Sequence, residues 1–120
     1  MIWDTCRRDF ESDGALRDIC VHATTIEDWR SLYGVLRATY RLEYSIDGTQ
    51  QALPATVDEG LATRSTSSPM ICFHVGAAMV ICHFFEIHQI EMDIDPREVT
   101  SQMTLDDLLG FLRLVGDTLG

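Results

Sequence analysis

The chain has 120 residues, 46% of them apolar, and its 19 acidic and nine basic residues give a formal charge of −10. A chain of this length can bury a core without disulfides or metals, so we expect a single domain over residues 1–120. The negative charge repels phosphate backbones and anionic membranes, which argues against nucleic-acid and membrane partners.

The chain begins without an apolar run of secretory length, and its longest apolar stretch, near residues 77–82, is too short to span a bilayer. These features predict a cytoplasmic protein. The four cysteines lack C-x-x-C spacing and lie in apolar patterns typical of reduced, buried thiols. We therefore expect folding to need no cofactor, metal or disulfide.

Turn and capping signals organise the first half of the chain. Asp13-Gly14 between two extended runs is typical of a hairpin. Thr25-x-x-Asp28 is typical of a capping box, and the apolar residues after it recur at helical intervals. In chain order, the patterns predict strands at 5–10 and 15–22, a helix at 25–38, a strand at 41–46 with a turn at Asp47-Gly48, a short helix at 54–61 and a loop at 62–69.

A meander of three strands is predicted for the second half, at 70–75, 79–85 and 89–95. Gly76-Ala77 suits a two-residue turn, and a three-residue loop at 86–88 keeps the apolar residues of the next pair on one face. The expected register pairs Met70 with His83, Ile71 with Cys82, Cys72 with Ile81, Phe73 with Val80, Phe84 with Ile90, Cys82 with Met92 and Val80 with Ile94.

A last amphipathic helix is expected at 104–118, capped by Thr104-x-x-Asp107. The strand parities place the apolar residues on one face of the sheet, which both main helices can cover. We therefore predict an α+β fold, an antiparallel sheet of about six strands with two main helices packed on one face. The opposite face is expected to carry Asp18, Cys20, His22, Cys72, His74, His83, Glu91, Asp93 and Asp95.

Two Cys-x-His pairs lie on that opposite face. Cys20 with His22, and Cys72 with His74, each place a thiol and an imidazole on one side of a strand. The four groups could bind zinc if the two strands were neighbours. Their spacing matches no familiar zinc pattern, so a half-buried face of mixed residues is the simpler interpretation. A small enzyme or metal-binding domain that uses this face is one alternative function.

His83 and Glu91 face each other in the expected register, and an imidazole beside a carboxylate can act as an acid/base pair. The sequence contains no nucleophile elbow, phosphate loop or H-E-x-x-H motif to accompany them. We therefore interpret the pair as an ordinary cross-strand contact and predict no catalytic residues.

Carboxylates recur at every second position of the last strand, at Glu91, Asp93 and Asp95, and Glu98 follows closely. Such residues can keep a surface soluble and protect a sheet edge from aggregation. They can also offer preorganised acceptors to the Arg and Lys residues of a partner. We predict that a protein partner binds Glu91, Asp93, Asp95, His83 and Glu98. The carboxylates of the strand, Glu91, Asp93 and Asp95, are expected to be exposed and to contribute little to stability.

The segment HFFEIHQIEMDIDPREV, from His83 to Val99, precedes a short amphipathic helix and resembles the C-terminal part of small acidic bacterial immunity-type proteins. Those proteins bind and neutralise toxins in the cytoplasm. The resemblance implies that the chain inhibits a toxin, and a basic nuclease is one kind of toxin that it implies. The expected function is therefore an immunity- or antitoxin-like inhibitor with an acidic binding surface. A homodimer or other structural subunit that associates through its sheet face is the remaining alternative.

Overall fold

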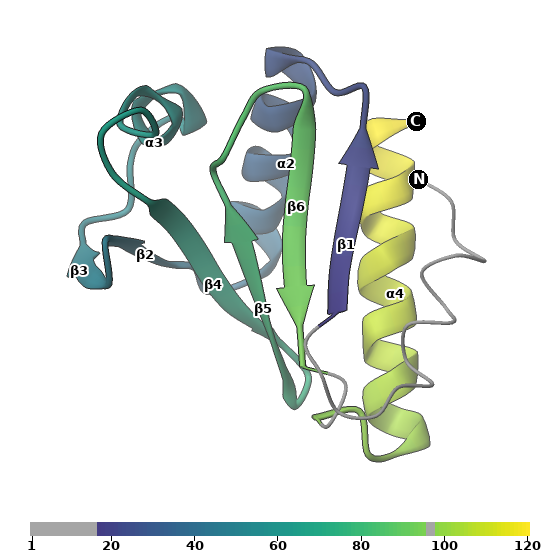
Figure 1. The fold of residues 1–120 in the computed structure, drawn as a ribbon. Helices are drawn as coiled ribbons and strands as arrows, with labels where there is room; N and C mark the ends of the chain where they lie inside the picture. Colours follow the sequence, from purple (N-terminus) through teal and green to yellow (C-terminus); the bar gives the residue numbers. More distant parts are fainter. Residues whose placement is uncertain (1–16, 96–97) are drawn as a thin grey trace.

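The computed structural model describes residues 17–95 and 98–120 (Figure 1). In chain order, the described elements are β1 (Arg17–His22), α2 (Ile26–Thr39), β2 (Glu43–Ile46), β3 (Thr49–Gln51), α3 (Val57–Ala62), β4 (Pro69–Val75), β5 (Ala78–His83), β6 (Gln89–Ile94) and α4 (Gln102–Leu119). The strand predicted at 5–10 and the hairpin turn at Asp13-Gly14 lie outside the described residues.

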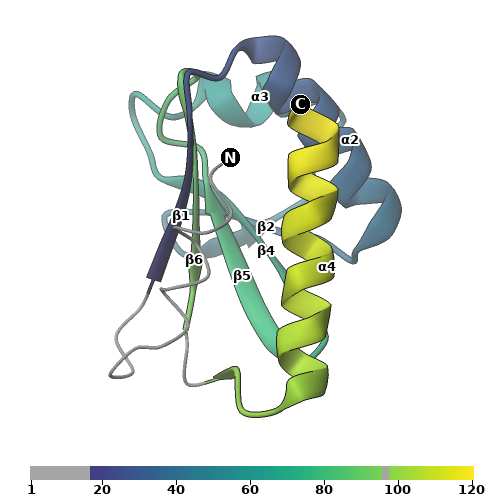
Figure 2. The ribbon, with the colours of Figure 1, turned by 90° about the vertical axis from the view of Figure 1, so that its right-hand side faces the viewer.

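The described strands form one antiparallel sheet of six strands in the order β1-β6-β5-β4-β2-β3. α2 and α4 lie side by side on one face of this sheet, and α3 packs against α2 and β4 (Figure 2). The predicted α+β architecture is therefore confirmed. In this order β5 and β6 are interior strands, and the described edges are β1 and β3.

The core lies between the helix layer and the sheet. The sheet contributes the alternate apolar residues that the parities predict, each at most 7% exposed: Ile19, Val21, Ile71, Phe73, Val75, Val80, Phe84, Ile90, Met92 and Ile94. The helices contribute their apolar stripes, Trp29, Leu32, Tyr33 and Leu36 from α2 and Leu108, Phe111, Leu112 and Val115 from α4. Burial of these side chains is the main force that holds the two layers together.

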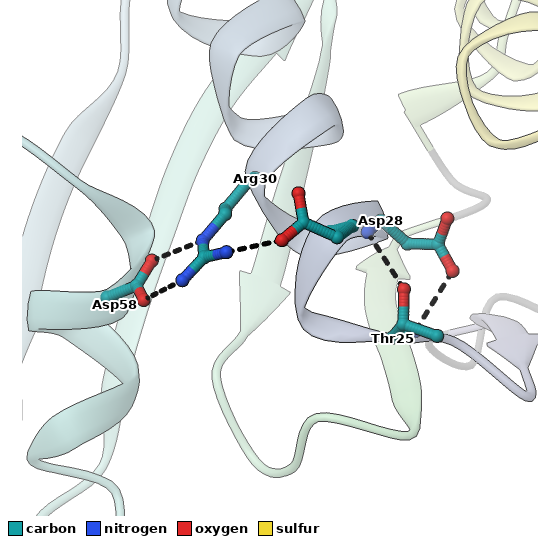
Figure 3. A network of polar contacts seen from close by, with 5 residues as sticks. Thr25, Asp28, Arg30 and Asp58 are labelled. Atoms are coloured by element: carbon teal, nitrogen blue, oxygen red, sulfur yellow. Dashed lines mark hydrogen bonds and ion pairs between the residues drawn. The ribbon is translucent and has the colours of Figure 1, made fainter.

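The predicted capping box opens α2. The Thr25 hydroxyl accepts from the Asp28 amide, and the Asp28 carboxylate accepts from the Thr25 amide at 2.9 Å (Figure 3). One turn on, the guanidinium of Arg30 donates two bonds to Asp58 of α3, at 3.1 and 2.7 Å (Figure 3). It also donates one bond to Glu27. The bonds from Arg30 lower the pKa of the Asp58 carboxyl. Because these groups are exposed, their contacts orient α3 on α2 more than they stabilise the fold.

α4 begins earlier than predicted. Its N-cap is Ser101, whose hydroxyl accepts from the amide of Thr104 at 3.2 Å, so Thr104 is a helical residue rather than the cap. Ser and Thr are similarly good N-caps, and the sequence offers both within four positions. The two added helical residues, Gln102 and Met103, are exposed, so they do not extend the buried apolar stripe. Phe111 is buried at 1% exposure. The sequence predicts an apolar stripe without it, made of Leu105, Leu108, Leu109, Leu112, Val115 and Leu119.

β3 is a strand that the sequence analysis missed. It pairs with β2 through a tight turn at Asp47-Gly48, whose φ angles of 52° and 82° are both positive. Asp-Gly is the dipeptide that two-residue hairpin turns of this kind favour. The residues of β3 are all exposed and polar, so no hydrophobic alternation marks them.

The register of the meander is confirmed from β4 to β5, and from β5 to β6 at Cys82 with Met92 and Val80 with Ile94. The predicted pair of Phe84 with Ile90 is wrong, because β5 ends at His83. The loop that follows is anchored on the start of α2 instead. The indole of Trp29 donates to the carbonyls of Glu86 and Ile87, and the Thr24 hydroxyl also donates to Ile87.

Candidate functional site

No described helix covers the sheet face opposite α2 and α4 (Figure 2). We call this surface the open face. The strands alternate along their length between buried residues toward the helices and less buried residues toward this surface. Its members include Cys20 and His22 of β1, Met70, Cys72 and His74 of β4, Met79, Ile81 and His83 of β5, Phe85 after β5, Gln89, Glu91 and Asp93 of β6, and Asp95 after β6.

Apolar side chains occupy the centre of the open face, along β5. Met79 is 36% exposed and Phe85 53%, and Ile81 between them is half-buried. Single exposed apolar residues are common on protein surfaces, but several in one row beside charged groups are typical of interaction sites. Phe85 is not among the predicted site residues, although it lies in the segment from His83 to Val99 that resembles immunity-type proteins.

The acidic residues form a second row, along β6. Burial of Ile90, Met92 and Ile94 at 0–1% exposure confirms that the intervening carboxylates point to the other side. Their predicted exposure is wrong, because Glu91, Asp93 and Asp95 are half-buried. The reason is that β6 lies between β1 and β5, whose side chains flank it on both sides. These acids therefore do not protect a sheet edge.

His83 links the two rows. Its Nε2 atom lies 2.5 Å from Oδ2 of Asp93, and both side chains are less than a fifth exposed. Glu91 is its partner in the strand register, as predicted, but the hydrogen bond runs diagonally to Asp93. The imidazole also stacks on the Phe85 ring, with centroids 4.6 Å apart and planes at 6°. The His83 imidazole is therefore fixed in position, with the Phe85 ring stacked on it and the carboxylates of Asp93 and Glu91 beside it.

Glu98 lies at one end of the open face. Its Oε1 atom accepts from the backbone amide of Met79 at 3.4 Å. β6 ends at Ile94, so this carboxylate serves a β5 amide near the end of the ladder. Of the predicted partner-binding residues, Glu98 thus has a local structural use, whereas the side-chain carboxylate of Glu91 makes no hydrogen bond within the described residues.

The two Cys-x-His pairs do not meet. β6 and β5 separate β1 from β4, so Cys20 and Cys72 are at least about 14 Å apart, the width of three strand spacings. The condition for a shared zinc site is therefore not met. Across residues 17–95 and 98–120, no group of three His, Cys, Asp or Glu residues is arranged to hold a metal ion. Cys82 faces the core, where burial raises the pKa of its thiol to about 12.

Two of the hollows that described residues line adjoin the sheet and the helices. One, of about 270 Å³, lies at the end of the open face where β2 meets β4, and Arg41, Glu43, Cys72, Phe73, His74 and Met79 line it. The other, of about 290 Å³, lies between α2 and α3. In that second hollow Arg30 is already paired with Asp58, and Arg37 donates to the carbonyls of Pro54 and Ala55. Its positive charges are therefore largely committed to the fold.

Asp93→Ala is expected to lower the free energy of unfolding by about 1 kcal/mol, because His83 loses its half-buried acceptor. Glu91→Ala is the matched control, since it removes a carboxylate from the same strand and face without breaking a hydrogen bond; we expect a change within about 0.5 kcal/mol. Urea unfolding of both variants measures the difference. Equal losses would show that the two acids are held alike and that the diagonal contact contributes nothing.

The described residues thus bring His83, Glu91 and Asp93 together on the open face, with Phe85 beside them and Glu98 at its end. No protein-family model, curated protein or solved structure matches the chain. Within the part of the chain that the structure describes, no helix combines the length and the apolar character needed to cross a membrane.

Proposed function

We propose that this chain is a protein-binding domain whose open face receives a positively charged partner, and most specifically an immunity- or antitoxin-like inhibitor of a toxin. One observation carries the proposal: the Phe85 ring is 53% exposed on a sheet face that no described helix covers, and it stacks on His83, which Asp93 holds. Aromatic anchors supply affinity at protein interfaces, and neighbouring charges select the partner.

The charge of the face supports a basic partner. Glu91, Asp93 and Asp95 stand in one row on a protein of formal charge −10. A field of this sign attracts a basic protein over a distance of about one Debye length, roughly 8–10 Å at physiological salt. It also speeds association of the correct partner and disfavours acidic ones. A basic toxin fits this description.

The alternatives receive less support from the same surface. Self-association through the open face would bring the acids of one copy against those of a second, which costs free energy. An acid/base enzyme would need a nucleophile or substrate-orienting group beside the imidazole. The described open face instead pairs His83 with Asp93 and covers one side of its ring with Phe85.

The proposal is tested by affinity capture from the source organism with three tagged forms of the full chain: the natural protein, Glu91→Arg and Asp117→Arg. Asp117 is exposed on α4 in the helix layer, so its reversal changes the net charge equally but leaves the open face intact. A protein captured by the natural chain and by Asp117→Arg, but lost with Glu91→Arg, is then purified and co-expressed with each form.

We expect Glu91→Arg to weaken binding of the purified partner about thirtyfold, equivalent to roughly 2 kcal/mol, with a smaller effect at high salt. The partner alone should arrest growth, and the natural chain should restore it. A partner that binds Glu91→Arg and the natural chain equally well would remove the open face from the interface. A partner that is harmless when expressed alone would leave protein binding in place and exclude toxin neutralisation.

A further inference from the structure

The open face has the layout of a surface that receives an α-helix. From its geometry we infer that the partner docks a helix with one basic and one apolar stripe along β5 and β6. The inference rests on the proposed function and names the kind of partner element that the site takes. The helix would complete a third layer, so that helices cover both faces of the sheet.

The backbone of the two rows excludes the main alternative, which is addition of a partner strand. β5 and β6 each lie between two other strands, so the ladders on both their sides are already formed. A partner strand could pair only at a sheet edge, which among the described strands means β1 or β3. A partner that reaches the acids must therefore do so through side chains. An α-helix presents side chains while its own backbone groups are satisfied internally.

The spacing of the acids matches that of a helical stripe. Alternate residues of a strand recur about every 6.6 Å, so the row from Glu91 to Asp95 is about 13 Å long. Residues i, i+4 and i+8 of an α-helix recur every 6 Å and span about 12 Å. Three Arg or Lys residues in such a stripe would therefore stand at the same spacing as the three carboxylates.

The β5 row supplies the apolar half of the same surface. Phe85 and Met79 are exposed at its two ends, and it runs about 4.8 Å from the acidic row. A helix with its side chains is about 10 Å wide, enough to cover both rows at once. Apolar residues next to the basic stripe would then contact Met79, Ile81 and Phe85. The partner helix is thus amphipathic in a specific sense, with arginine or lysine beside apolar residues.

Two synthetic peptides of the same composition test the inference on the full chain. In the first, Arg residues at i, i+4 and i+8 adjoin an apolar stripe at helical intervals. In the second, the same residues are permuted so that Arg and apolar residues alternate, as in a strand. Affinity is measured at low and high salt, and amide chemical shifts in the protein locate each peptide. Glu91→Arg and Asp117→Arg serve as test and control.

We expect the helical peptide to bind at least tenfold more tightly than the permuted one and to shift the amides of Phe85, Glu91 and Asp93. The circular dichroism of the helical peptide should show a gain of helix on binding. Its affinity for Glu91→Arg should be lower than for the natural chain, and its affinity for Asp117→Arg should be unchanged. Equal binding of both peptides at these residues would overturn the helix and leave the acidic binding surface standing. Absence of binding by the helical peptide at millimolar concentration, or shifts confined to β1 or β3, would overturn it as well. The affinity-capture experiment tests the proposed function separately. That function fails if Glu91→Arg captures the partner as well as the natural chain does.

Discussion

Phe84→Ala is expected to lower the free energy of unfolding by about 3–5 kcal/mol, the range for loss of a buried phenyl ring. The side chain is 1% exposed, meets the Trp29 ring edge-on at a centroid distance of 5.4 Å and lies 6.2 Å from the Tyr44 ring. Because these rings come from α2 and β2, they cannot close the cavity without moving separate elements. Urea unfolding followed by tryptophan fluorescence measures the loss.

Phe85→Ala is the matched control, since it makes the same change one residue further along the chain. Phe85 lies on the open face, where its described ring contact is the stack on His83, so we expect a loss below about 1 kcal/mol. Binding should show the reverse order, with Phe85→Ala impaired and Phe84→Ala affected only through its stability. Similar losses of stability in the two variants would mean that the chain leaves β5 with a different parity from the one described.

Local signals explain why much of the fold could be predicted. The capping box at Thr25 and Asp28 formed as expected, because both partners lie within one helical turn. Gly76, whose φ is +60°, allows the two-residue turn from which the β4–β5 register follows. A side chain there would also meet the Asp107 carboxylate, because an added Cβ would lie 2.3 Å from its Oδ2 atom. The turn signal was visible in the sequence, whereas this contact with α4 was not.

Long-range pairing explains what could not be predicted. β1 pairs with β6 across most of the chain length, and no turn or capping pattern specifies such a partner. For this reason the separation of Cys20 from Cys72 became known only from the strand order. The predicted pairing of Phe84 with Ile90 was wrong for a related reason, because a loop follows His83. Its carbonyls are held by Trp29 and Thr24, side chains roughly 60 residues away in sequence.

The candidate site shows the same division. Strand parity placed Glu91, Asp93 and His83 on one face, because alternation is a local property of the chain. Which acid His83 contacts depends on a diagonal neighbour in the sheet, so the sequence indicated Glu91 where the structure has Asp93. Half-burial of the acids depends on both flanking strands, and the neighbour β1 was unknown. Sequence therefore identified the face, and the fold determined how each group is held.

Gly60→Ala is expected to lower the free energy of unfolding by about 1–3 kcal/mol, although alanine is the better helix former. Gly60 is buried in α3, and an added Cβ would lie 2.6 and 2.8 Å from the Cε2 and Cδ2 atoms of Phe84. Those distances are too short for non-bonded carbon atoms. The Phe84 ring cannot easily retreat, since Trp29 and Tyr44 lie against it. Thermal and urea unfolding should both report the loss.

Gly34→Ala provides the control of opposite sign. Gly34 is an exposed residue of α2, and an added Cβ would meet no atom within 4 Å. Here only the backbone preference acts, so alanine should raise the free energy of unfolding by about 0.5–1 kcal/mol. Both variants replace a helical glycine by alanine. The difference between their free energies of unfolding therefore isolates the contact between α3 and Phe84. If Gly60→Ala instead stabilised the protein, α3 would not lie against the Phe84 ring. The assignment of Phe84 to the core and of Phe85 to the open face would then be wrong.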